Sequence, residues 1–366
     1  MDALMLPLNW QKVRLGDICE IVKGQQINKI SLNNTDKYPV INGGIDFLGY
    51  TNKFNVSKNT IAISEGGTCG YVRFMSSNFW SGGHNYSLQK ISNKVNNLCL
   101  YHILKSYEKD IMKLGVGSGL KNIQLKALKD FEIPLPPLNE QIAIANILSD
   151  LDRYLCSLRA LILKKESVKK ALSFELLSQR KRLKGFNQNW QKVRLGDICE
   201  IVKGQQINKI SLNNTDKYPV INGGIDFLGY TNKFNVSKNT IAISEGGTCG
   251  YVRFMSSNFW SGGHNYSLQK ISNKVNNLCL YHILKSYEKD IMKLGVGSGL
   301  KNIQLKALKD FEIPLPPLNE QIAIANILSD LDSEIISLKN KKRQFENIKK
   351  ALNHDLMSAK IRVLKK

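Results

Sequence analysis

The sequence predicts an α+β protein with two β-rich globular domains and two long helices that pair as an antiparallel coiled coil. Three observations support this prediction. Residues 9–152 return without a single change as residues 189–332, so both halves must fold alike. Each half begins with short apolar runs separated by glycine and asparagine, which is typical of strands and turns. Each half ends in a long stretch without proline or glycine, where apolar residues recur every three or four positions.

The repeat sets the expected domain organisation. We expect one domain over residues 1–137 with a helix over 138–185, then a second domain over 186–317 with a helix over 318–366. An antiparallel helix pair would relate the two halves by an approximate two-fold axis. Two origins of the repeat stay open, a recent duplication and a fusion of one half to itself.

Within the first half, short apolar runs and turn residues predict a mixed, β-rich unit. A strand and a short helical turn are expected over residues 13–22, and further strands over residues 38–42, 60–64, 71–74, 86–88 and 131–134. Helices are expected over residues 97–114 and 124–129, with a flexible loop over residues 115–119 between them. The second half repeats each element 180 positions later.

The stretch over residues 138–184 is expected to be a single helix of roughly 70 Å, at about 1.5 Å per residue. Asn139 is a suitable N-cap, Gly185 suits the C-terminus, and Arg180, Lys181, Arg182 and Lys184 would favour the helix dipole there. Lys165 and Lys169 interrupt the apolar seam. The seam consists of Ile144, Leu148, Leu151, Leu155, Leu158, Ile162, Leu172 and Leu176, and its counterpart of Ile324, Leu328, Leu331, Ile335, Leu338, Phe345, Leu352 and Leu356. A narrow seam of this kind needs a partner helix, and the chain carries two.

The formal net charge of +22 is concentrated in the distal parts of the helices. Residues 153–188 hold ten Lys and Arg against two carboxylates, and residues 333–366 hold ten against three. This excess favours a polyanionic partner, most simply nucleic acid. A solvated basic face on a coiled coil is the alternative interpretation.

Cysteine usage and hydropathy indicate a cytoplasmic protein. The seven cysteines are odd in number and form no CxxC pair, so neither a disulfide framework nor a metal site is expected. No secretory leader and no run of 18 apolar residues is present, so no membrane partner is expected.

The motifs of several enzyme classes are absent. An amino-methyltransferase would need Asn or Asp before a Pro-Pro pair and an aromatic residue after it, whereas Leu135 and Leu138 flank Pro136-Pro137. The sequence has no GxxxxGK[ST] loop and no GxSxG elbow. His84 and His102 lack metal-ligand spacing. We therefore expect no catalytic residue, no metal and no cofactor.

Four polar loops, over residues 23–29, 65–70, 79–86 and 115–122, carry the side chains that base edges and phosphates require. Gln pairs with adenine through two hydrogen bonds, Lys reaches guanine or phosphate, and aromatic side chains offer flat surfaces. Plain turn chemistry explains any one loop better when it is taken singly, so the case rests on four such loops in one basic unit, and Tyr71, Trp80 and Tyr86 could equally be core residues. The candidate DNA-binding residues are Lys23, Gln25, Gln26, Lys29, Thr68, Tyr71, Arg73, Trp80, His84, Asn85, Tyr86, Ser118 and Lys121, with the copies Lys203, Gln205, Gln206, Lys209, Thr248, Tyr251, Arg253, Trp260, His264, Asn265, Tyr266, Ser298 and Lys301.

The order of these segments resembles a known family. A β-rich unit, a loop reading GVGSGLKNI, the segment FEIPLPPLNEQIAIANIL and a long helix follow one another twice. This arrangement closely resembles the specificity subunit of type I restriction–modification enzymes over essentially the whole chain. The segment IPLPPLNEQ with its helix carries most of the resemblance, because the loops are less specific.

The resemblance implies a non-catalytic subunit with two target recognition domains joined by conserved helices. Such a subunit reads a two-part site in double-stranded DNA. It holds methyltransferase subunits, here two, and restriction or translocase subunits in the full complex. The two recognition domains are identical here, whereas family members commonly carry different ones, so we expect an inverted-repeat target. A non-catalytic coiled-coil scaffold or an RNA-binding protein is the alternative.

Overall fold

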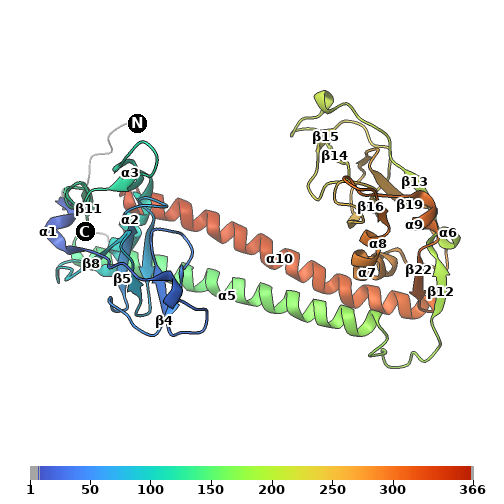
Figure 1. Cartoon of the computed structure of the whole chain (residues 1–366), viewed down its shortest axis with the longest axis horizontal. Helices are drawn as coiled ribbons and strands as arrows, with labels where there is room; N and C mark the ends of the chain where they lie inside the picture. The colour runs from blue at the N-terminus through green and yellow to red at the C-terminus, as the bar shows by residue number, and fades with distance from the viewer. Residues whose placement is uncertain (1–6, 8, 364–366) are drawn as a thin grey trace. The chain divides into compact units, whose positions relative to one another are not determined.

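The computed structural model describes residues 7 and 9–363, apart from the side chain of Ser211, so residues 1–6, 8 and 364–366 of the predicted domains lie outside the described part. The chain forms two compact units (Figure 1). Unit 1 comprises Met1–Arg159 with Asn340–Lys366, and unit 2 comprises Ala160–Lys339. Each unit contains one β-rich domain and part of both long helices, which confirms the predicted α+β fold.

The first domain contains short elements, and most of them lie where the apolar runs predict them. They are β1 (Gln11–Arg14), α1 (Leu15–Ile18), β2 (Glu20–Lys23), the 3-10 turn η1 (Lys29–Ser31), β3 (Tyr38–Ile41), β4 (Gly49–Thr51), β5 (Thr60–Ser64), β6 (Val72–Met75), β7 (Trp80–Ser81), β8 (Asn85–Gln89), α2 (Asn97–Ser106), α3 (Glu108–Lys113), β9 (Gly115–Val116), β10 (Asn122–Ile123), α4 (Leu125–Lys129) and β11 (Glu132–Leu135).

The second domain repeats this order. Its elements are β12 (Gln191–Arg194), α6 (Leu195–Ile198), β13 (Glu200–Lys203), η2 (Lys209–Ser211), β14 (Tyr218–Ile221), β15 (Gly229–Thr231), β16 (Thr240–Ser244), β17 (Val252–Met255), β18 (Trp260–Ser261), β19 (Asn265–Gln269), α7 (Asn277–Ser286), α8 (Glu288–Lys293), β20 (Gly295–Val296), β21 (Asn302–Ile303), α9 (Leu305–Lys309) and β22 (Glu312–Leu315).

The main sheet of the first domain has the antiparallel order β2-β8-β5-β6. A second sheet has the order β4-β3-β7, in which β3 and β7 are parallel. All five residues of β5 are buried, which fits its apolar, β-branched sequence TIAIS. The carboxyl ends of β2 and β5 and the start of β8 lie at one end of the main sheet, because Lys23 pairs with Tyr86 and Ser64 with Asn85.

The two long helices are α5 (Leu138–Leu177) and α10 (Leu318–Met357), and they pack antiparallel within each unit. As residue numbers rise along α5, those of the facing residues fall. In unit 1, Arg159 pairs with Glu346 and Asp152 with Lys349. In unit 2, Lys165 pairs with Glu334 and Lys169 with Asp332. The two lysines that interrupt the seam of α5 therefore find carboxylates on α10.

Burial confirms the predicted seam. Every residue of the seam predicted for α5, from Ile144 to Leu176, is buried or half-buried, and so is every residue of the seam predicted for α10, from Ile324 to Leu356. Ile144, Ala145, Leu148, Leu356 and Met357 belong to the hydrophobic core of the first domain. Each domain therefore packs against the first turns of one helix and the last turns of the other, as Leu177, Ile324 and Leu328 do in unit 2.

Both long helices end earlier than predicted, at Leu177 and Met357 instead of near residues 184 and 366. Gln179 and Ala359 adopt left-handed backbone angles, with φ of 59° and 57°, which stop a right-handed helix. The amide of Lys181 then bonds to the carbonyl of Glu175. The cations at residues 180–184 consequently follow the helix, and the prediction that the helix continues through them was wrong.

Two shorter predictions also need correction. The helix expected over residues 97–114 is split at Tyr107, whose ψ of 9° ends α2 and starts α3. The loop expected to be flexible over residues 115–119 begins as strand β9, which pairs with β10 in a short hairpin. Among the residues that the structure describes, no helix combines the length and apolar character needed to cross a bilayer.

Candidate nucleic-acid interface

The four candidate loops of the first domain converge at the end of the main sheet where β2 and β5 end. The amide of Gln25 donates to the carbonyl of Ser81 at 2.8 Å, and the amide of Glu65 donates to that of His84 at 2.9 Å. The amide of Ile123 donates to the carbonyl of Glu65 at 2.9 Å. We call this surface the loop surface. It comprises residues 23–26, 42–44, 65–70, 80–84 and 115–122, with the copies 203–206, 222–224, 245–250, 260–264 and 295–302.

Glycine permits the close approach of these loops. A Cβ on Gly24 would lie 2.1 Å from the carbonyl oxygen of Gly82, and one on Gly66 would lie 2.3 Å from Asn122 Oδ1. Gly43 has a φ of 82°, and its carbonyl accepts a hydrogen bond from the amide of Thr68 at 2.8 Å. The absence of a side chain at these glycines therefore lets the backbones of the loops approach closely.

A buried carboxylate, Glu65, anchors the loop surface. Lys23 Nζ donates to Glu65 Oε1 at 2.7 Å. The hydroxyl of Tyr86 lies 3.1 Å from the same oxygen and 3.0 Å from the carbonyl oxygen of Ile123. Burial and the neighbouring carboxylate raise the pKa of Tyr86 to about 12, so the hydroxyl keeps its proton.

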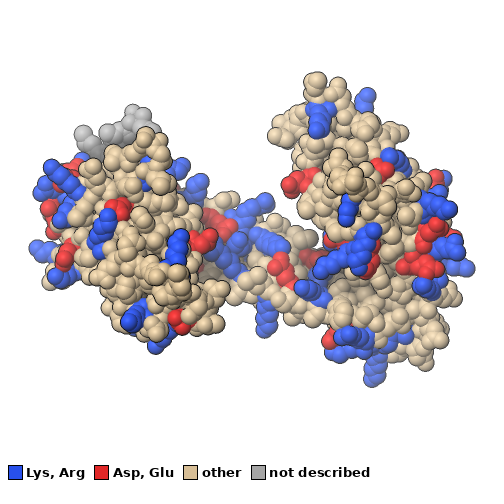
Figure 2. Space-filling view, viewed as in Figure 1, with Lys and Arg blue, Asp and Glu red and all other residues tan. Residues whose placement is uncertain are grey.

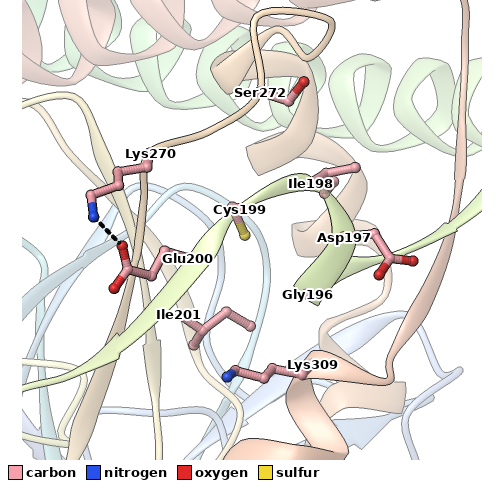
Figure 3. Close-up of a pocket in the computed structure, with 9 residues that line it drawn as sticks. All are labelled: Gly196, Asp197, Ile198, Cys199, Glu200, Ile201, Lys270, Ser272 and Lys309. Atoms are coloured by element: carbon pink, nitrogen blue, oxygen red, sulfur yellow. Dashed lines mark ion pairs between the residues drawn. The ribbon is translucent and has the colours of Figure 1, made fainter.

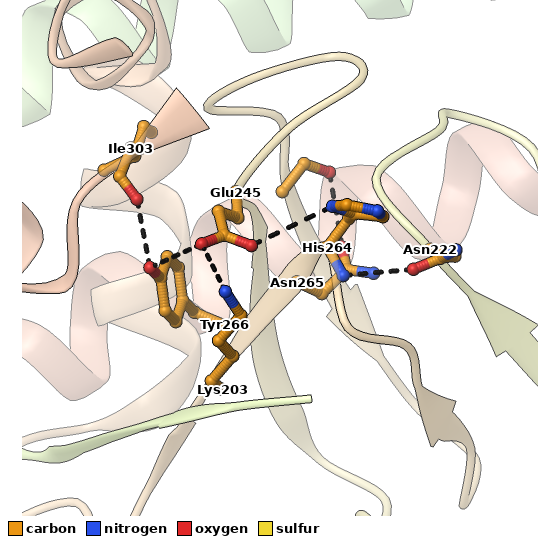
Figure 4. Close-up of polar contacts among 8 residues, drawn as sticks. Lys203, Asn222, Glu245, His264, Asn265, Tyr266 and Ile303 are labelled. Atoms are coloured by element: carbon orange, nitrogen blue, oxygen red, sulfur yellow. Dashed lines mark hydrogen bonds and ion pairs between the residues drawn. The ribbon is translucent and has the colours of Figure 1, made fainter. Parts of the chain in front are cut away.

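Figure 4 shows the copy of this cluster in unit 2, where Lys203 and Tyr266 both contact Glu245, and the hydroxyl of Tyr266 also contacts the carbonyl of Ile303. There the imidazole Nδ1 of His264 also lies 4.0 Å from Glu245 Oε2. The amide of His264 donates to Asn222 Oδ1 at 3.0 Å, which fixes the loop between β18 and β19.

Several of the predicted DNA-binding residues are exposed. Lys23, Gln25, Gln26, His84, Ser118 and Lys121 lie on the loop surface, as do their copies. Lys29 is exposed in the turn η1, three residues beyond Gln26. Among the described residues Lys121 has no ion-pair partner, whereas Lys23 is already paired with Glu65. Lys121 is thus the cation of this surface most available to a phosphate.

Other predicted residues form the framework beneath the loop surface. Asn85 and Tyr86 are buried, at 1% and 2% exposure. The indole of Trp80 donates to the carbonyl of Gln25 at 3.0 Å and so holds the loop that presents Gln25 and Gln26. Thr68 is half-buried and binds Gly43 through its backbone. Asn85 and Tyr86 are therefore covered by the domain, whereas Trp80 and Thr68 position the loops and stay half-buried.

Arg73 also has a structural partner. Its Nη2 donates to the carbonyls of Gly44 and Ile45 at 2.7 and 2.6 Å, and its guanidinium lies over the rings of Tyr71 and Phe47. Burial lowers the pKa of Arg73. Arg73 with Tyr71 therefore fixes the loop after β3.

Reasoning from the sequence included Asn122 among the polar residues of the loop over residues 115–122 but missed Glu65. Glu65, the anchor, lies in a predicted loop, but its carboxylate has the wrong sign for a DNA contact and so gives no signal of one. Asn122 is exposed beside Gly66 and carries an amide of the kind that reads bases. The glycine pair Gly66-Gly67 was the available signal, because it indicates a close approach of another segment.

Charge is spread over the molecule. Figure 2 shows Lys and Arg on both β-rich domains, with carboxylates interspersed, and no single large basic patch on the visible face. Many helix cations are paired with carboxylates of the facing helix, as Lys349 is with Asp152. The loop surface is therefore distinguished by its exposed amides and lysines and not by a high charge density.

A pocket of about 400 Å³ lies at the opposite end of the main sheet in unit 2 (Figure 3). Cys199 lines it, and burial raises the pKa of its thiol to about 12. Glu200 and Lys270 pair at 2.8 Å across it. A protonated thiol and a neutralised ion pair provide no activated nucleophile at this pocket. In the part of the chain that the structure describes, no group of three His, Cys, Asp or Glu is arranged to hold a metal.

Comparisons with known proteins agree with this geometry. A family model described as "Type I restriction modification DNA specificity domain" matches residues 7–166 and again residues 187–347. A putative type I specificity subunit of Mycoplasma genitalium is 31% identical, over 84% of this chain and 82% of the relative. A putative type I restriction enzyme specificity subunit of Methanocaldococcus jannaschii is also 31% identical, over 94% and 84%.

A solved structure gives the same result. The crystal structure of the S subunit of a type I restriction–modification system from M. genitalium matches with a TM-score of 0.80 and 28% identity, covering 96% of this chain and 98% of that chain. The family model covers most of the chain, once in each half. The chain therefore belongs to the specificity subunits of type I restriction–modification systems, the non-catalytic subunits that recognise the DNA target.

Proposed function

We propose that the loop surface of each unit reads one half of a two-part site in double-stranded DNA. One observation carries the proposal: four loops distant in sequence meet at one end of the main sheet and present Gln25, Gln26, His84, Lys121 and Asn122 to solvent. Amides supply paired donors and acceptors for base edges, and lysine neutralises phosphates. In this proposal residues 1–137 and 186–317 recognise DNA, and residues 138–185 and 318–366 hold partner subunits.

The two half-sites should have the same base sequence, because residues 9–152 and 189–332 are identical. Each domain is joined to the start of its own long helix, and the two helices run antiparallel in each unit. We therefore propose that the half-sites are inverted copies, separated by bases that the protein does not read.

The partners of such a subunit are DNA, methyltransferase subunits and restriction subunits. We propose that two methyltransferase subunits bind equivalent surfaces at the starts of α5 and α10, in a cytoplasmic complex. Leu138 and Ile142 are 40% and 43% exposed on the first turns of α5, and Leu318 and Ile322 are 39% and 41% exposed on α10. Exposed apolar side chains on two identical segments suit two copies of one partner.

Removing Lys121 and Lys301 together should weaken DNA binding in a manner that depends on salt and not on base sequence. If each lysine neutralises one phosphate, the slope of log affinity against log salt should fall in magnitude by about 2. Gln25→Ala with Gln205→Ala should instead lower the preference for target over non-target duplex. Binding is measured by fluorescence anisotropy on the complex with its methyltransferase subunits.

The matched control is Lys129→Ala with Lys309→Ala. These lysines are exposed and lie beside Gly16 and Gly196, at the end of the sheet away from the loop surface. The control should keep the wild-type slope, because the net charge changes equally but no proposed phosphate contact is lost. Equal slopes for the two double variants would contradict the placement of DNA on the loop surface. Absence of duplex binding by the wild-type complex would contradict the function itself.

A further inference from the structure

Two aliphatic side chains in each unit are almost fully exposed. Of the Ile, Leu, Val and Phe residues that the structure describes, Ile30, Leu120, Ile210 and Leu300 exceed four-fifths exposure, at 91%, 81%, 92% and 82%. The next most exposed, Leu163, reaches 64%. An apolar side chain with so little cover contributes nothing to the core of the domain.

Leu120, unlike Ile30, lies in a hairpin whose base is fixed by contacts with the domain core. It lies in the tip of the hairpin β9–β10, and this hairpin is fixed to the loop surface. Ile123, three residues later, is 1% exposed, and its amide and carbonyl bind the glutamate cluster through Glu65 and Tyr86. In strand β9, Gly115 packs closely against Cys69, since a Cβ on Gly115 would lie 2.5 Å from Cys69 Sγ. The base of the hairpin is therefore held by the core while its tip stays open.

The neighbours of Leu120 have the chemistry of a DNA contact. Ser118, Lys121 and Asn122 are exposed on the same hairpin, so a hydroxyl precedes the leucine and a cation and an amide follow it. A Cβ on Gly119, next to the leucine, would have no atom within 4 Å, which leaves room for a groove wall. An apolar side chain between groups that bind phosphate and base edges would meet an apolar group in the groove. In the major groove, the 5-methyl group of thymine is that group.

We propose that Leu120, and Leu300 in the second half, are specificity-determining residues that pack against the 5-methyl group of a thymine in each half-site. This inference rests on the proposed function, because it places DNA on the loop surface. It adds a named base and a non-polar contact to a surface otherwise made of polar side chains. The partner is duplex DNA, and the selected chemistry is a single methyl group.

The test compares thymine with deoxyuridine, which lacks the 5-methyl group and keeps the same base pairing. Each thymine of the target found by mapping methylated sites is replaced in turn, in both half-sites at once. Burial of one methyl group is worth roughly four-fold in affinity, so loss of two should cost the wild-type complex about ten-fold or more at one symmetric position. The Leu120→Ala, Leu300→Ala complex should bind the two duplexes equally at that position.

Leu163→Ala is the control, since it shortens an exposed leucine on α5 and should retain the wild-type preference for thymine. A double variant that discriminates thymine from deoxyuridine as the wild type does would overturn the inference. So would a target without thymine in its half-sites. A rise in 2-aminopurine fluorescence with wild type, without any thymine preference, would mean that the leucine separates base pairs and would also overturn it. Failure of the wild type to bind DNA at all would instead contradict the proposed function.

Discussion

Replacing Arg182 by alanine is expected to destabilise unit 2 by about 3 kcal/mol or more, because it leaves a buried carboxylate without its cation. Arg182 Nε and Nη2 donate to the two oxygens of Glu320 at 2.8 and 2.7 Å. Glu320 is 1% exposed and also accepts a hydrogen bond from the indole of Trp190 at 3.0 Å. The arginine thus fastens the segment after α5 to the first turn of α10.

Unit 1 has the same arrangement at the other end of the sequence. Arg362 donates to Glu140 at 2.7 and 2.9 Å, and Glu140 is 2% exposed beside the indole of Trp10. Arg362→Ala should therefore cost about as much as Arg182→Ala. The measurement is the free energy of unfolding in urea, followed by circular dichroism.

Two further variants show whether the buried charge causes the loss. Glu320→Gln added to Arg182→Ala should recover part of the stability, because a neutral amide costs less to bury than an unpaired carboxylate. Lys181→Ala breaks an exposed pair with Glu175 and should change stability by less than about 1 kcal/mol. An Arg182→Ala protein within about 0.5 kcal/mol of wild type would refute the structural role of this pair.

Acid should destabilise the protein well above the range where carboxylates titrate, through His102 and His282. These histidines are 3% and 4% exposed on α2 and α7. Burial, with the nearby ammonium of Lys349 or Lys169, lowers their pKa from 6.5 to about 4, and Asp152 or Asp332 opposes this only in part. Each histidine is therefore neutral in the folded protein at pH 5.

The direction of the effect follows from proton linkage. Below pH 6.5 the unfolded chain gains a proton at each histidine and the folded chain does not, so unfolding becomes easier. The contribution of the two neutral histidines to the free energy of unfolding is fully present above pH 6.5 and is lost as the pH falls towards 4. Between pH 7 and pH 5 the loss should be about 2 kcal/mol for each histidine.

Urea unfolding of wild type and of the His102→Gln, His282→Gln variant at both pH values measures this loss. The variant should lose about 4 kcal/mol less than wild type between pH 7 and pH 5, since glutamine does not titrate. Either single variant, His102→Gln or His282→Gln, should show about half of this difference, since each histidine contributes about 2 kcal/mol. Identical losses in wild type and the double histidine variant would exclude these residues as the cause.

Periodicity and repetition were sufficient to predict most of the fold. Apolar steps of three and four placed Leu148, Leu155 and Ile162 in the helix seam, and strands such as β5 followed from their β-branched runs. The helix ends could not be predicted in this way. The left-handed residue that stops α5 is Gln179, whereas glycine is the residue type that usually indicates a left-handed helix end.

The sequence predicted which loops form the candidate interface, but it did not predict how these loops are arranged in space. Composition identified the polar loops around Gln25 and Lys121. Their meeting depends on long-range pairing, such as the ion pair of Lys23 with Glu65 across 42 positions, which no local pattern encodes. Burial, which the sequence does not give, also determines which side chains are available to DNA. The sequence predicts Tyr86 as an aromatic base contact, whereas its ring lies in the core and its hydroxyl binds Glu65.

Sequencing the sites that the assembled methyltransferase complex modifies is the most direct test of the central claim, that two identical domains read DNA. The modified sites should share one motif whose two halves are inverted copies of each other, separated by a fixed number of unread bases. Altering Gln25 alone or Gln205 alone should relax one half of that motif each time, to the same extent. A reproducible motif with two different halves would contradict the claim.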